Sequence, residues 1–242
     1  MIQPRGARFS WVTSIVGGDP TAYRNSLVAL VVAIVASLVA GITLATTTDT
    51  LEELPGLLLL VPAALAVKGN IFGALGSRLG TSIHAGVFQL SPRLDTVVGQ
   101  NTAAALVLSL VVSVELALLA KGVAVVFDIT PTMSTADFVT VSALGGATAS
   151  LVVLVITLLL AGGSVRFGWD LDNVVAPLVT ATGDVVTLPA LMWAAALADI
   201  GGVTTTVALV STAVSVPAAV WAICSPRPIL RSIMRESLPI LT

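Results

Sequence analysis

The sequence has few charged residues, one cysteine and one histidine, and each scarcity excludes a class of protein. Charged residues make up 10% of the 242 positions, whereas soluble domains carry about 25%. The single cysteine, Cys224, excludes an intramolecular disulfide and a metal site built from several cysteines. The single histidine, His84, excludes a multi-histidine transition-metal site within one chain. A net charge of −2 argues against a nucleic-acid partner.

Apolar residues take the place of the missing charges. They make up 56% of the chain, and the mean hydropathy is +1.04. A soluble core does not need this excess, so the composition indicates an integral membrane protein in a lipid bilayer. The polar N-terminal residues and the lack of a cleavage site after the first apolar run argue against a secretory signal peptide. No stretch between the apolar runs is long enough to form a soluble domain.

The apolar runs predict an all-α polytopic membrane protein with six transmembrane helices. A spanning helix needs about 20 largely apolar residues. Six segments satisfy this requirement, at residues 25–46, 54–80, 97–120, 137–164, 173–197 and 202–224.

Loop charges predict how these helices are oriented. Nearly every basic loop residue falls on one side of the six-helix arrangement, and the acidic loops fall on the other. The protein is expected in the cell membrane. Because an excess of lysine and arginine marks the cytoplasmic side, both termini are expected in the cytoplasm. Residues 1–24 form a cytoplasmic segment in this interpretation, and residues 225–242 form a cytoplasmic tail. The tail is either a short amphipathic helix along the headgroups or a solvated segment.

Four ionisable residues within or beside the predicted helices need an explanation. Such groups cost about 2.5–3.5 kcal/mol each at bilayer depth, and they usually face a cavity or a partner. Asp172 has a second interpretation as a helix N-cap, where the helix dipole favours an acid. Asp184 lies twelve residues further on, about 18 Å along a helix, and has no such explanation. The other two are Lys68 and Glu115.

The surroundings of Asp184 in the sequence are rich in oxygen. Pro177 lacks an N–H and leaves the carbonyl of Asn173 without its usual helical partner. Thr180 lies one turn before Asp184 on the same face. Carboxylate, hydroxyl and carbonyl oxygens suit hard cations such as Mg²⁺ or Ca²⁺. The alternative is a protonated Asp184 that hydrogen-bonds to a neighbouring helix.

The second predicted helix is the most interrupted. Pro62 and Gly69 weaken its hydrogen bonding, which membranes tolerate where other helices or water satisfy the freed groups. Asn70 then points toward a wet cavity, or it links two helices in a packing seam. Glycines at spacings of three and four residues allow close helix approach, at Gly73, Gly76 and Gly80.

Three cationic or titratable side chains in this helix need separate interpretations. Arg78 and His84 fall near its cytoplasmic end, where long side chains extend to the headgroups. Lys68 lies deeper. Because a cation repels a cationic cargo, Lys68 is expected either to pair with Glu115 or to face away from any cation path.

Two stretches together resemble a known family. PAALAVKGNIFGALGSRLGTSIHAG resembles the P-A-L-x(n)-G-N segment of the MgtE-type magnesium transporters, particularly their eukaryotic solute-carrier and archaeal branches. DLDNVVAPLVTATGDVVTL resembles the D-P-D-N and G-D segment of the same family. VGQNTAAALVLSL looks like the start of its third helix, where Gln100 matches. The resemblance covers roughly residues 25–200, and the two motifs occur in the right order.

The resemblance implies a five-helix unit that pairs with a second copy. The ion path then lies at the two-fold interface between the copies and is lined by helices 2 and 5. Residues 201–224 then form an additional helix. Asp184 matches the acid that holds a largely hydrated Mg²⁺, and Asn70 matches the asparagine beside it. The remaining matches are the Thr180 carbonyl, the cytoplasmic-end residues Asp172 and Asn173, and the pore-lining or structural residues Pro62, Gly69, Pro177, Gly183 and Gln100.

The resemblance also predicts partners and leaves alternatives open. We expect a homodimer in a lipid bilayer, no fused N-terminal sensor or CBS domain, and no cofactor besides the transported ion. The second helix contains Lys68 and lacks the G-G-N-A-G-x-Q motif of the bacterial members. A carrier for Co²⁺ or Mn²⁺, or Na⁺-coupled Mg²⁺ exchange, is therefore an alternative to Mg²⁺ transport through a pore. An intramembrane hydrolase is remote, because ATGD lacks the first glycine of G-x-G-D and Glu115 is the wrong acid. We therefore expect a transporter and not an enzyme.

Overall fold

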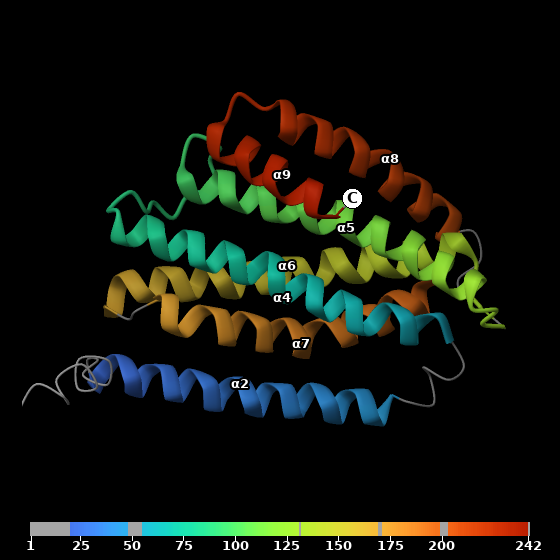
Figure 1. Cartoon of the computed structure of the whole chain (residues 1–242), viewed down its shortest axis with the longest axis horizontal. Coiled ribbons are helices and arrows are strands. Elements are labelled where there is room, and N and C mark those ends of the chain that lie inside the picture. The colour runs from blue at the N-terminus through green and yellow to red at the C-terminus, as the bar shows by residue number, and fades with distance from the viewer. Residues whose placement is uncertain (1–19, 48–54, 131, 169–170, 199–202, 242) are drawn as a thin grey trace, which may run out of the picture.

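The computed structural model describes residues 20–47, 55–130, 132–168, 171–198 and 203–241, and these form a bundle of helices without strands (Figure 1). Six of the helices are long and apolar enough to cross a membrane, which confirms the predicted number. Five of them are longer than the predicted segment, because the helical turns continue past the apolar run, and α8 begins one residue later than predicted. The helices are α2 (Pro20–Thr46), α4 (Pro55–His84), α5 (Val97–Val126), α6 (Thr135–Phe167), α7 (Leu171–Ala198), α8 (Val203–Cys224) and α9 (Pro228–Leu241).

Helix α7 joins the two sides of the bundle. It packs against α6, α4 and α2, and α2 lies on the outer side of α7 (Figure 1). On the other side, α5 packs against α6 and α4 and also contacts α8 and α9. The outward faces carry large apolar side chains, such as Leu38, Leu159 and Leu209. An exterior of this kind fits a polytopic membrane protein with lipid around it.

Small residues allow the inner helices to pack closely. A Cβ atom added at Gly145 of α6 would lie 2.9 Å from Leu191 Cα and 3.1 Å from Ala190 O of α7. Larger buried side chains fill the space on either side of such contacts, including Phe138 and Phe72. The α6–α7 interface therefore depends on a missing side chain at position 145.

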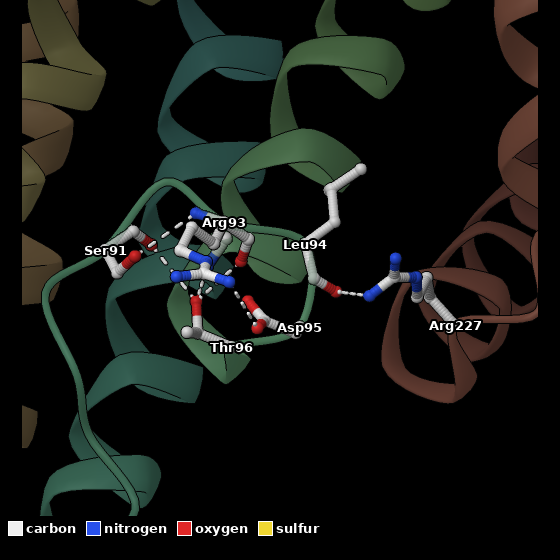
Figure 2. Close-up of polar contacts among 7 residues, drawn as sticks. Ser91, Arg93, Leu94, Asp95, Thr96 and Arg227 are labelled. Carbon is white, nitrogen blue, oxygen red and sulfur yellow. Dashed lines mark hydrogen bonds and ion pairs between the residues drawn. The ribbon is translucent and has the colours of Figure 1, made fainter.

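The loop before α5 is built from short-range polar contacts (Figure 2). Thr96 caps the helix, since its hydroxyl oxygen accepts from Gly99 N at 3.1 Å. Arg93 and Asp95 form an exposed ion pair at 3.4 Å. A side chain at Gly99 would overlap the carbonyl of Arg93, so only glycine allows the loop to fold back this closely. This ordered loop provides an anchoring point for the C-terminal helix.

Helix α9 is fastened to the start of α5. The Arg227 guanidinium donates to the Leu94 carbonyl at 2.6 Å (Figure 2). The buried Gln100 side chain accepts from the N–H groups of Ile229 at 3.1 Å and Leu230 at 3.4 Å. Because the first N–H groups of a helix have no helical partner, Gln100 acts as a cap supplied by another helix.

The C-terminal segment therefore differs from a solvated tail. One face of α9 buries Leu230, Ile233 and Met234 against Ala104 and Leu108 of α5 and Ala222 of α8. From the end of α8, α9 turns back along α5 toward the middle of the bundle (Figure 1). The amphipathic pattern expected within residues 225–242 is present, but its apolar face packs on protein.

Replacing Gly145 by alanine is expected to destabilise the bundle by about 1–3 kcal/mol, since the added methyl group meets backbone atoms that cannot move aside. Thermal unfolding of the purified protein in detergent measures the change. Gly122→Ala is the matched control, because no atom lies within 4 Å of a Cβ at that helical position. Equal stability of the two variants would contradict the close α6–α7 contact.

Gln100→Ala is expected to release the first turn of α9, at a cost of about 0.5–2 kcal/mol, typical of a lost helix cap. Hydrogen exchange of residues 228–241 should become faster, while exchange in α7 stays unchanged. Ser232→Ala, an exposed change on α9 itself, serves as the control. Unchanged protection of α9 in Gln100→Ala would show that Gln100 does not hold this helix.

Candidate functional site

Helices α4 and α7 cross closely near their middles, at two glycines. A Cβ atom at Gly69 would lie 3.2 Å from Thr180 Cγ2 and 3.5 Å from Thr180 Oγ1. A Cβ atom at Gly183 would lie 3.8 Å from Gly69 N and 3.7 Å from Lys68 Cβ. Because Asn70 follows Gly69 and Asp184 follows Gly183, the crossing places both polar residues at one level of the bundle.

The close helix approach predicted at the glycines of α4 is partly confirmed. A side chain at Gly76 would overlap Val175 of α7, so this glycine does allow close packing. Gly73 has no atom within 4 Å of its Cβ position and makes no such contact. The close contacts of α4 with α7 therefore lie at Gly69 and Gly76.

Asp184 opens into a pocket of about 210 Å³ between α2, α4 and α7. The Asp184 carboxyl group is half-buried, and the Ser37 side chain of α2 is its hydrogen-bond partner. The rest of the lining is apolar or small, from Ala40, Gly41, Leu44, Val61, Leu65 and Leu188. The pocket therefore combines one carboxylate and one hydroxyl at membrane depth.

This pocket contains too few ligands to enclose a bare metal ion. Among the described residues, no group of three or more His, Cys, Asp or Glu side chains could hold a metal. A single carboxylate suits a cation that keeps most of its water, and Mg²⁺ in particular dehydrates reluctantly. The chemistry available from one chain is therefore electrostatic attraction through water.

Asn70 lies on a different side of α4. It is exposed and lines a separate pocket of about 240 Å³ between α4, α5 and α9. The other polar residues there are Arg78 of α4 and Ser237 of α9, and the remaining lining is apolar. Asn70 and Asp184 thus share a level of the bundle, but one chain does not bring them into one cavity.

The other predicted site residues occupy varied positions. Thr180 is exposed on α7 beside Gly69, and Gly183 is buried at the crossing. Pro62 is exposed within α4, and Pro177 is half-buried within α7. Asp172 and Asn173 lie in the first turns of α7, and their side chains are outside the described part of the structure. Gln100 caps α9 and has a structural role.

Lys68 points away from the Asp184 pocket. Its side chain is 1% exposed and extends between α4, α5 and α6. The ammonium donates to Ser150 Oγ at 2.7 Å and also to Ser109 Oγ. The suggested pairing with Glu115 is therefore wrong, and the Lys68 side chain lies away from the Asp184 pocket. The alternative, that Lys68 faces away from a cation path, stays a prediction.

Two sets of site residues were not found by sequence reasoning. Ser37 was overlooked, although it is a polar residue in a nearly continuous apolar run. The serines around Lys68 were overlooked because isolated hydroxyl residues are common in membrane helices. Their spacing of four residues, at Ser109 and Ser113 on one helix and at Ser142, Gly146 and Ser150 on the next, was the available signal.

Comparison with known proteins identifies the family. The family model MgtE, described as a divalent cation transporter, matches residues 61–194, more than half of the chain. The chain is 30% identical over 152 residues to solute carrier family 41 member 2 of Gallus gallus. It is 31% identical over 150 residues to the Xenopus laevis protein of the same name. Each alignment covers 60% of this chain and 26% of the relative.

The chain thus spans about a quarter of the length of these curated relatives. No solved structure matches it. The matched residues 61–194 begin in α4 and end in α7, so they include both glycines of the crossing and the Asp184 carboxylate. On the family match and the six apolar helices, the protein is a multi-pass membrane protein of the MgtE family of divalent cation transporters.

Proposed function

We propose that this chain transports divalent cations, with Mg²⁺ as the expected substrate, across the cell membrane through a homodimeric path lined by α4 and α7. The observation that carries the proposal is the Asp184 carboxylate, which faces a pocket at the α4–α7 crossing. A carboxyl group at membrane depth is costly unless it serves a cavity or a partner. Membership in the divalent cation transporter family supports this use of Asp184.

Electrostatics supports a hydrated divalent ion as the cargo. One carboxylate attracts a doubly charged ion about twice as strongly as a singly charged one, and low dielectric surroundings strengthen that attraction. The Ser37 hydroxyl beside Asp184 can hydrogen-bond to the water that the ion retains. Lys68 is oriented toward α5 and α6, so its ammonium does not enter this pocket.

A second copy of the chain would complete the path. The side of α4 that carries Asn70 also exposes Pro62, Ala66 and Ser77, which follow one another on this face at spacings of four or seven residues. Exposed polar groups at membrane depth need water or protein as partners. Two copies related by a two-fold axis through this face would supply two Asn70 amides, and each copy would contribute its own Asp184 pocket.

The same proposal places both termini in the cytoplasm. Six membrane spans return the chain to the side on which it starts, and the basic residues concentrate on that side. Under this orientation, the anchoring of α9 by Gln100 and Arg227 lies at the cytoplasmic end of the bundle.

Asp184→Asn is expected to lower Mg²⁺ flux into proteoliposomes by at least about tenfold, the change that follows from losing about 1.4 kcal/mol of attraction. Flux is measured with a Mg²⁺-sensitive dye under an imposed membrane potential. Adding Co²⁺, Mn²⁺ or a Na⁺ gradient in turn then separates the substrate alternatives.

The matched control for this measurement is Asp95→Asn, which removes a carboxylate from an exposed loop. We expect Asp95→Asn to retain wild-type flux, because its ion pair with Arg93 lies outside the pocket. Wild-type flux in Asp184→Asn would exclude this residue from the cation path.

Homodimer formation through α4 is tested by cysteine cross-linking in a Cys224→Ser background. Ala66→Cys is exposed on the proposed interface, and oxidation in membranes should give a covalent dimer. Leu209→Cys, exposed on α8, should remain monomeric under the same conditions. Cross-linking at Leu209 and not at Ala66 would place the dimer interface on the other side of the bundle.

A further inference from the structure

The surroundings of Lys68 have a chemistry that the proposed cation path does not use. The ammonium lies near the middle of α4, is almost fully buried and donates to Ser109 of α5 and Ser150 of α6. No carboxylate among the described side chains forms an ion pair with it. A buried lysine usually needs a charged partner, and here its partners are neutral oxygens.

The hydroxyl groups are oriented so that their oxygens face the ammonium. Ser150 donates its single proton to the Gly146 carbonyl at 2.6 Å. In the short contact between Ser109 and Ser150, Ser109 must therefore be the donor. Both hydroxyl oxygens are left to accept from Lys68 Nζ, and this orientation favours a positive charge at that point.

Gly146 creates the space in which this charge is held. A Cβ atom at Gly146 would lie 3.3 Å from Lys68 Nζ and would overlap Ser113 Oγ. The Ser113 hydroxyl therefore borders the same space. The facing helix is held in register by Ser142, which donates to the Ser113 carbonyl at 2.6 Å.

The charged groups on the surrounding helices lie elsewhere. Helix α5 carries Glu115, which is half-buried, and Lys121, which donates to the Met133 carbonyl at 2.7 Å. On α7, Asp184 faces the pocket formed with α2. Helix α6 carries Asp137 and Arg166 in its first and last turns, away from its middle. The site around Lys68 Nζ is thus an oxygen-lined space with no other charged group beside it among the described side chains.

We propose that the Lys68 ammonium is a built-in monovalent cation, which occupies a site that would otherwise bind Na⁺. Neutral oxygen ligands at the midplane of a helical bundle are the kind of site in which transporters hold a coupling Na⁺. The ammonium has the same charge and is covalently attached, so the site needs no ion from solution. It follows, on the basis of the proposed function, that divalent cation transport by this chain requires no Na⁺.

The test compares wild type with Lys68→Ala, which removes the ammonium and leaves the three hydroxyl groups. Thermal unfolding is measured in Na⁺ and in choline at equal ionic strength. The wild-type midpoint should not change between the two salts. Lys68→Ala should be less stable in choline and should regain at least about 2–4 °C as Na⁺ is added, because an ion that binds only the folded state stabilises it.

Two controls separate ion binding from a general effect of removing a lysine. Lys121→Ala removes the chain's other lysine, which has a carbonyl partner, and should show no Na⁺ dependence. Lys68→Met fills the space with an apolar chain and should gain no stability from Na⁺. A folded Lys68→Ala that responds equally to Na⁺ and choline would overturn the proposal.

Flux measurements decide the matter if Lys68→Ala does not fold. Wild-type Mg²⁺ flux should be the same with Na⁺ or choline on both sides of the proteoliposome, and a Na⁺ requirement would overturn the proposal. The unfolding experiment does not depend on transport. Na⁺ stabilisation of Lys68→Ala together with normal flux in Asp184→Asn would therefore remove the proposed path and keep the Lys68 site.

Discussion

The close contact between α4 and α7 is the constraint on which the rest of the structure depends. The two backbones meet at Gly69 and Gly183, and the residues that follow these glycines are Asn70 and Asp184. The preceding residue on α4 is Lys68, whose side chain leaves the crossing on the α5–α6 side. Three polar groups thus diverge from one contact into three different environments: a pocket under α2, a pocket under α9 and a cluster of serines.

This divergence separates charges of opposite sign without an ion pair. A carboxylate and an ammonium at bilayer depth would attract strongly if they met, and a bound pair would be of no use to a passing cation. The crossing prevents the encounter because the two side chains leave it in different directions. Each group then has its own hydroxyl partners, Ser37 for Asp184 and Ser109 with Ser150 for Lys68. The bundle can therefore keep both groups without cancelling either.

Sequence reasoning predicted what depends on local pattern and missed what depends on how helices face one another. The six spans follow from apolar runs, and Asp184 is conspicuous because a carboxylate in such a run is costly. Which helix covers Asp184 is not encoded in that run, so Ser37 was not identified. The packing of α9 was missed for a similar reason, since its partner Gln100 lies more than a hundred residues earlier. The family resemblance places Asn70 beside Asp184, but in one chain the two residues line separate pockets.

Helix α2 is the most loosely held wall of the Asp184 pocket. Ala29 is its one buried apolar residue in the part of the chain that the structure describes, and most of its surface faces outward. Among the described helices, α2 packs on α7 alone, and a helix held on one side belongs to the low-stability end of a protein's local opening reactions. Sideways displacement of α2 is therefore the least costly rearrangement that changes the volume around Asp184. The lipid packed against α2, and the thickness of the bilayer around it, then become determinants of how often that carboxylate is accessible.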